Sequence, residues 1–183
     1  NFNRLRPKLE AFLPLYPVTV VFPIPHNKWV IWMDEATGEL SPRHKSPVTG
    51  SIYHAFPELY RIKRFLKDPN LSFAFPLVDM DEYRLLNGWS KNRKRGSSRY
   101  DRMPLELFDV IWIERAEDFM QVIPYDLPEP FTIKEFAKAA KIHRDLAASV
   151  VPLLKEMKLV RWVGNRGREY LYETIDTDKE AYS

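Results

Sequence analysis

The chain has 183 residues, of which 45% are hydrophobic and 14% aromatic, so its composition excludes a largely disordered protein. It contains no cysteine, which excludes disulfides, thiolate zinc sites and a cysteine nucleophile. No apolar run approaches the roughly 18 residues that a membrane-spanning helix needs, so we expect a cytoplasmic protein without membrane contact. The net charge is +3, and residues 173–183 alone carry −3, which leaves +6 on residues 1–172. This positive balance is compatible with a polyanion as partner.

Short strands and two helical patterns alternate along residues 1–125. Apolar residues recur at helical spacing over 5–16 and 52–66, and Pro57 predicts that the second helix starts near Phe56 or kinks there. We expect an α+β domain with a small mixed or antiparallel sheet and one amphipathic helix against it. Runs of β-branched and aromatic residues predict its strands, at 18–24, 28–34, 71–78 and 107–114.

Glycine and proline mark two further features of this region. Gly38 predicts a turn at 35–39, because glycine readily adopts the positive φ that such a turn often needs. Leu40 would then begin the returning strand. Pro76 indicates that the 71–78 strand lies at a sheet edge or contains a bulge.

Residues 87–104 (NGWSKNRKRGSSRYDRMP) are predicted to form a basic loop, with Trp89 and Tyr100 among the cations. Such a loop can neutralise several phosphates and stack an aromatic ring on an unpaired base, or it can be an ordinary solvated loop. Its Gly96-Ser97-Ser98 segment predicts a mobile tip. The candidate phosphate contacts are Lys91, Arg93, Lys94, Arg95, Arg99 and Arg102.

Residues 126–130 (DLPEP) are rich in proline and lack apolar periodicity, so they predict a linker and a domain boundary. The pattern of apolar residues differs after them. A capping box at Thr132 and Glu135 predicts the start of a helix that runs to about Ala140. A second helix is predicted over 144–157, followed by strands at 159–163 and 169–173 with a basic turn over 164–168. Residues 174–183 are predicted to be a frayed acidic tail.

The order of helix, short turn, helix, strand, basic turn and strand in FTIKEFAKAAKIHRDLAASVVPLLKEMKLVRWVGNRGREYLYE resembles a winged helix-turn-helix domain. The resemblance covers 131–173, within a predicted domain of 126–173, and implies that the second helix enters a DNA major groove while the turn contacts the backbone or minor groove. Pro152 inside that helix, and a face without Asn or Gln, favour non-specific contact. The alternative is a module that binds protein. The residues implied to face DNA are His143, Arg144, Ala148, Ser149, Lys155, Asn165, Arg166 and Arg168.

Acidic residues around the first predicted hairpin give a second functional hypothesis. The order of helix, hairpin, helix and strand resembles the core of PD-(D/E)xK nucleases, which implies Mg²⁺ held by Asp34 and Glu39 and a water activated with the help of Lys45. The acid that should precede this lysine by two residues is Arg43 instead. The sequence has no HExxH, GxSxG, GxxxxGK[ST] or GxGxxG motif either.

The sequence therefore favours a bacterial nucleic-acid-binding protein, with double-stranded DNA as the expected partner and the N-terminal domain contributing partner binding or homo-oligomerisation. The alternatives are a metal-dependent nuclease and an adaptor whose basic loop meets an acidic protein in a larger assembly. No cofactor is expected except Mg²⁺ in the nuclease alternative.

Overall fold

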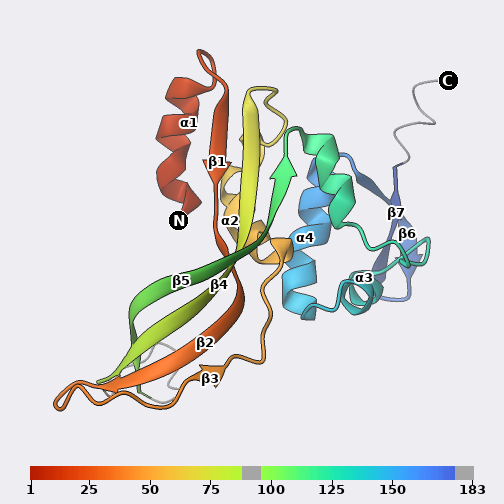
Figure 1. Ribbon diagram of the computed structural model, residues 1–183. Coiled ribbons are helices and arrows are strands. Elements are labelled where there is room, and N and C mark those ends of the chain that lie inside the picture. The colour runs from red at the N-terminus through yellow and green to blue at the C-terminus, as the bar shows by residue number, and fades with distance from the viewer. Residues whose placement is uncertain (88–95, 176–183) are drawn as a thin grey trace. The chain divides into compact units, whose positions relative to one another are not determined.

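The computed structural model describes residues 1–87 and 96–175, and they form two compact units assembled from segments distant in sequence. The elements of both units can be followed in Figure 1. The domain boundary expected near residue 125 falls inside unit 1, and a separate domain at 126–173 stays a prediction. Unit 1 comprises Asn1–Phe22, Ile52–Ala74 and Trp112–Ser183, and unit 2 comprises Pro23–Ser51 and Phe75–Ile111.

A mixed sheet of five strands confirms the α+β class expected from the sequence. β4 pairs with three of the other strands: β1 and β2 run parallel to it, and β5 also pairs with it. β3 runs antiparallel to β2. Leu40 makes only an isolated bridge to Met33, so the returning strand expected there is reduced to β3. The strands are β1 (Val18–Val21), β2 (Ile24–Asp34), β3 (His44–Lys45), β4 (Leu71–Leu86) and β5 (Ser98–Ile113).

Pro76 lies in the central strand, so the edge position predicted for it is wrong. The pairing with β1 ends at Ala74 and the pairing with β2 begins at Leu77. A residue without an N–H is tolerated between these two partners because neither β1 nor β2 needs its hydrogen bond there.

The predicted loop over 87–104 is also wrong for its second half. Residues from Ser98 belong to β5, a strand of 16 residues, and Ser97 is only 2% exposed, so this end of the stretch is not a mobile tip. Four of the predicted phosphate contacts, Lys91, Arg93, Lys94 and Arg95, lie outside the described residues together with Trp89.

The helical segments of the first part of unit 1 are short. The helix predicted over 52–66 consists of η2 (Ile52–Ala55), α2 (Phe56–Leu59) and η3 (Tyr60–Phe65), with non-helical backbone at Ile62. Pro57 lies in the first turn of α2, as its missing N–H requires. The other segments of this part are η1 (Phe2–Leu5) and α1 (Arg6–Phe12).

The inward face of the 52–66 segment was predicted correctly although its helix type was not. Phe56 packs edge-on against Phe119 of η4 (Ala116–Val122), with ring centroids 5.8 Å apart. The six residues predicted at helical spacing are all buried, namely Ile52, Ala55, Phe56, Leu59, Ile62 and Leu66.

The C-terminal part of unit 1 contains two helices and a hairpin. The predicted capping box is confirmed, because Thr132 Oγ1 accepts from the Glu135 amide at 3.2 Å and Glu135 Oε2 accepts from the Thr132 amide at 2.7 Å. Phe131 exchanges two backbone hydrogen bonds of 2.8 Å with Tyr172, which ties the start of this part to its last strand. The elements are α3 (Ile133–Ala139), α4 (Arg144–Glu156), β6 (Val160–Arg166) and β7 (Glu169–Thr174).

Two details of this part differ from expectation. The turn between the strands is only Gly167-Arg168, since β6 continues to Arg166, and Gly167 has a φ of 64°. The tail was expected from residue 174, but Thr174 belongs to β7 and the Ile175 amide donates to the Leu159 carbonyl. Residues 176–183 lie outside the described part of the chain.

No helix among the described residues is long and apolar enough to cross a membrane.

Candidate anion-binding site

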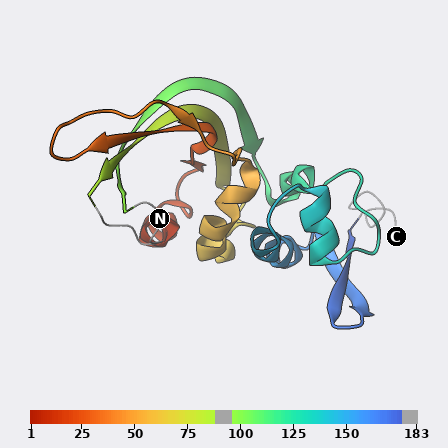
Figure 2. The ribbon, with the colours of Figure 1, turned by 90° about the horizontal axis from the view of Figure 1, so that it is seen from below.

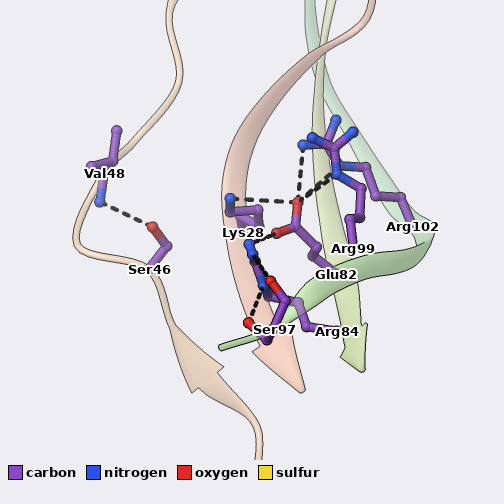
Figure 3. Close-up of polar contacts among 8 residues, drawn as sticks. All are labelled: Lys28, Ser46, Val48, Glu82, Arg84, Ser97, Arg99 and Arg102. Atoms are coloured by element: carbon purple, nitrogen blue, oxygen red, sulfur yellow. Dashed lines mark hydrogen bonds and ion pairs between the residues drawn. The ribbon is translucent and has the colours of Figure 1, made fainter. Parts of the chain in front are cut away.

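Unit 2 contains strands but no helix among its described residues (Figure 2). Its most concentrated charge is a group of five side chains that we call the Glu82 cluster: Lys28, Glu82, Arg84, Arg99 and Arg102. Figure 3 shows the four cations converging on the single carboxylate.

The carboxylate of Glu82 is buried, with 1% of the residue exposed. Arg102 donates to Oε2 through Nε at 3.0 Å and lies 2.9 Å from it through Nη2, while Arg84 Nη1 lies 3.1 Å from Oε1. Lys28 Nζ at 3.5 Å and Arg99 Nε at 3.8 Å from Oε2 complete the cluster. One negative charge is thus shared by four positive ones, which leaves a local surplus of +3.

Strand geometry explains three of these positions. Side chains two residues apart on a strand share a face, which places Glu82 and Arg84 together on β4. Lys28 of β2 lies opposite Met80, two residues before Glu82, and therefore joins the same face. Arg99 and Arg102 come from β5, the other strand that pairs with β4.

A β-bulge in β2 decides which residue faces Glu82. From Pro25 to Lys28 the strand advances three residues while β4 advances only two, from Val78 to Met80. Without this extra residue Asn27 would lie opposite Met80, because a shift of one residue exchanges the two faces of a strand. The bulge therefore puts a cation, rather than an amide, beside the buried carboxylate.

Asp79 holds the bulge in place. Its Oδ1 accepts from the Asn27 amide at 2.9 Å and lies 3.1 Å from His26 Nδ1, and Asn27 Nδ2 donates to both oxygens. Burial raises the pKa of Asp79, but the hydrogen bonds from Asn27 and His26 outweigh it and leave the pKa below its ordinary value. The His26 ring stacks on Phe108 of β5 at 4.0 Å, which fixes this corner of the sheet further.

The environment of Glu82 keeps it ionised. Burial raises the pKa of its carboxyl, whereas the hydrogen bond from Arg102 and the charges of Lys28, Arg102 and Arg99 lower it, and the net pKa lies below the ordinary value of 4.5. The cations themselves reach solvent: 58% of the Arg99 side chain and 35% of the Arg102 side chain are exposed. The cluster can therefore offer guanidinium N–H groups to an anion while Glu82 holds them in position.

Described residues on either side of 88–95 make hydrogen bonds at or next to this cluster. Arg84 donates through Nε to Ser97 Oγ at 3.1 Å and through Nη2 to the Ser97 carbonyl at 3.0 Å. Asn87 Nδ2 donates to Ser98 Oγ at 2.7 Å, which joins the residues on either side of the segment.

Two of the predicted phosphate contacts, Arg99 and Arg102, are thus brought together. Sequence reasoning missed their partners Lys28, Glu82 and Arg84. The available signal was the spacing of Glu82 and Arg84, which lie two residues apart and would share one face of a strand.

The residues of the nuclease hypothesis are arranged as parts of a hairpin. Asp34 Oδ1 accepts from the Ala36 and Thr37 amides, both at 2.9 Å, and these bonds lower the pKa of its carboxyl. The Asp34 amide donates to the Glu39 carbonyl, so these two residues lie across one turn. Lys45 instead pairs with Trp29 of β2. Trp29 precedes Asp34 by five residues, so the two lie about 16 Å apart along the strand. Among residues 1–87 and 96–175 no group of three His, Asp or Glu side chains is placed to hold a metal.

The predicted DNA-facing residues of α4 have local roles. His143 caps the helix, with Nδ1 accepting from the Asp145 amide at 3.3 Å, and Ser149 Oγ donates to the Leu146 carbonyl at 2.7 Å. Arg144 Nη2 lies 4.0 Å from Glu169 Oε1. Six residues of this helix are exposed. Two are cations (Arg144 and Lys155), two are acids (Asp145 and Glu156) and two are neutral (Ala148 and Pro152).

The hairpin cations are mostly paired as well. Arg166 Nη1 donates to Glu135 Oε1 at 2.7 Å, and Asn165 Oδ1 accepts from Trp162 Nε1 at 3.2 Å. Arg161 Nη2 donates to Glu173 Oε2 at 2.9 Å. Arg168 is exposed and has no ion pair within the described residues.

Comparison with known proteins assigns the first part of the chain to a family. A family model described as a domain of unknown function (DUF8091) matches residues 1–114, and the chain belongs to this family. Every residue of the Glu82 cluster lies within the matched range. An uncharacterised protein of Treponema pallidum (strain Nichols) is 24% identical over 179 residues, which cover 94% of this chain and 67% of the relative. No solved structure matches the chain.

Proposed function

We propose that the chain binds nucleic acid by contacting its phosphates with the Glu82 cluster of unit 2. The observation that carries this proposal is that four cations share one buried carboxylate, so that three positive charges are left without a balancing acid in the cluster. A backbone phosphate placed against Arg99 and Arg102 would neutralise one of these three charges.

The geometry of the cluster favours phosphate over a generic anion. Arginine presents N–H groups in a fork that matches phosphate oxygens, and two of the arginines are held by the carboxylate before any ligand arrives. Such pre-ordering reduces the side-chain entropy lost on binding. The exposed side chain of Arg99 is the best placed to make the first contact.

We infer further that residues 126–173 form a winged helix-turn-helix module. The order of Phe131, α3, α4, β6 and β7 supports this inference, since Phe131 before the two helices makes a bridge to Tyr172 in the last strand of the hairpin. Three of its four arginines, Arg144, Arg161 and Arg166, are paired with acids, and Arg168 at the tip of the hairpin is not. We therefore expect its arginines to add less to phosphate affinity than the Glu82 cluster does.

The test is a titration of a fluorescein-labelled DNA duplex, two helical turns long, with the full chain over a series of salt concentrations. Counterion release predicts that the logarithm of the affinity falls linearly with that of the salt concentration. Arg99→Gln should reduce the slope by about 0.9, the value for one lost phosphate contact. The matched control is Arg4→Gln, which removes an exposed arginine of unit 1.

Two results would refute the proposal. One is the absence of binding at low salt. The other is an equal loss of affinity in Arg99→Gln and Arg4→Gln, which would show that the overall charge, rather than the cluster, attracts the duplex.

A further inference from the structure

A pocket of about 800 Å³ lies in unit 1, and none of its lining residues belongs to the Glu82 cluster. It is lined by the end of α4, the start of β6, residues 67–69 and residues 115–117. Its floor is apolar, because Met157, Leu159 and Val160 line it and are themselves almost completely buried. Its volume lies in the range that small-molecule sites usually occupy.

The wall of this pocket includes an aromatic ring that is held in place and still accessible. Trp162 is 52% exposed, although large aromatic residues of a folded domain usually lie mostly inside. Its Nε1 donates to Asn165 Oδ1 at 3.2 Å, which restricts the orientation of the indole. An accessible and oriented indole offers a flat face on which another ring can stack.

Cations surround the rim in excess over acids. Lys67, Lys155 and Lys158 line the pocket, and none of their side chains has an ion pair or hydrogen bond within residues 1–87 and 96–175. The acids of the lining are Asp68 and Glu117. Arg115 adds a further cation, and Arg161 is already paired with Glu173.

Lys158 occupies a position where glycine is usual. It directly follows Met157, the C-cap residue of α4, and has a φ of 64°, in the left-handed region. Its amide donates to the Lys155 carbonyl, as in a common helix ending, but a residue with a Cβ adopts this conformation at a cost. A lysine side chain is therefore present on the rim at a position where a glycine would supply none.

We propose that this pocket binds a small aromatic organic anion, for which a purine mononucleotide is the model ligand. Its ring would stack on Trp162 over the apolar floor, and its phosphate would be met by Lys155, Lys158 and Lys67. Both the apolar floor with Trp162 and the three lysines are needed for this ligand. An anion without a ring would not contact the floor, and a neutral ring would leave the charges of the three lysines unbalanced.

The test is isothermal titration of the full chain with AMP, adenosine and inorganic phosphate. We expect saturable binding of AMP, at least about tenfold tighter than that of either fragment. Lys155→Gln should weaken AMP binding by roughly fivefold, the effect of one exposed charge pair. Trp162→Ala should weaken AMP and adenosine but not phosphate. The matched control is Lys138→Gln, which removes an exposed lysine of α3 that does not line the pocket.

The outcomes separate this proposal from the proposed function. Arg99→Gln should leave AMP binding unchanged, and Lys155→Gln should leave the Arg99-dependent part of the salt slope for duplex DNA unchanged. Equal affinity for AMP and inorganic phosphate, loss of AMP binding in Lys138→Gln, or no saturable AMP binding would overturn the pocket assignment. Because Lys155 is exposed, its variant tests the idea even if Trp162→Ala does not fold.

Discussion

The cations of unit 2 and those of the C-terminal part of unit 1 are arranged in opposite ways. In the C-terminal part, Arg161 and Arg166 each meet a separate exposed or half-exposed carboxylate. In unit 2, four cations meet one carboxylate that is 1% exposed. A count of basic residues does not distinguish the two regions, whereas the ratio of cations to acids at each site does.

The depth of the carboxylate adds a second difference. Surface ion pairs are screened by salt and contribute little to stability, while a buried carboxylate interacts strongly with its partners and is costly to leave unpaired. The Glu82 cluster should therefore be both a stability element and an anion site. The C-terminal pairs should be neither to any large extent.

The largest expected effect comes from Glu82→Gln. Removing the charge leaves four cations in mutual repulsion and should lower the free energy of unfolding by about 3 kcal/mol, the lower end of the cost of breaking a buried ion pair, because the partners are partly exposed. Urea denaturation followed by circular dichroism measures it. The comparison variant is Glu173→Gln in the Arg161 pair, for which about 0.5 kcal/mol is expected. Equal losses would contradict the distinction between the two regions.

The pH dependence of that loss is the next prediction. Because the folded-state pKa of Glu82 lies below 4.5, its stabilising contribution is fully present above pH 4.5 and disappears as the pH falls through the folded-state pKa. The difference in unfolding free energy between the wild type and Glu82→Gln should therefore be constant from neutral pH down to the ordinary pKa and shrink below it. A difference that grows on acidification would show that the carboxyl is protonated in the native state.

Asp79→Ala tests whether the bulge places Lys28. Loss of the carboxylate leaves the Asn27 amide and the His26 ring without their acceptor and should cost about 2 kcal/mol. It should also weaken duplex binding, because Lys28 and Asn27 would exchange faces if the bulge were lost. The Asp81→Ala variant, which removes the partner of Arg43 instead, provides the control. Unchanged DNA binding in Asp79→Ala would mean that the register is set elsewhere.

Thr132→Ala addresses the stability of the C-terminal part directly. The hydroxyl caps α3, so its removal should cost about 1 kcal/mol. Thr132→Ser keeps the hydroxyl and should retain most of that stability. Hydrogen exchange of the α3 amides locates the effect, and an equal loss in both variants would assign it to the missing methyl group instead.

The smallest effect is expected for Arg166→Gln. Its bond to Glu135 is partly exposed, so the loss of stability should stay below about 1 kcal/mol. Its effect on duplex affinity should be smaller than that of Arg99→Gln, measured by the same titration. A larger loss of duplex affinity in Arg166→Gln than in Arg99→Gln would make the hairpin the main phosphate contact and would contradict the difference between the two regions.

Local patterns predicted the elements better than the site. The apolar spacing of 52–66 identified every buried residue of that segment, because burial of a face is dictated by the periodicity itself. The helix type was missed because Pro57 and the tertiary packing divide the segment. The Thr132–Glu135 box was predicted correctly, because all of its atoms lie within four residues.

The Glu82 cluster was only half predicted. Arg99 and Arg102 were recognised as cations of a basic stretch, but that stretch was expected to be a loop, and its partners on β2 and β4 were overlooked. No local rule indicates that an extra residue between Pro25 and Lys28 selects which side chain meets Glu82. The pocket at Trp162 was missed for the same reason, since its lining comes from four separate segments.

The sequence by itself determined the α+β class, the buried face of 52–66, the capped start of α3 and the presence of surplus positive charge, because each follows from periodicity, local hydrogen bonding or composition. Only the tertiary structure decided which charges are balanced. A carboxylate compensates the cations within a few ångströms of it, and strand register and bulges, rather than sequence distance, determine which cations those are.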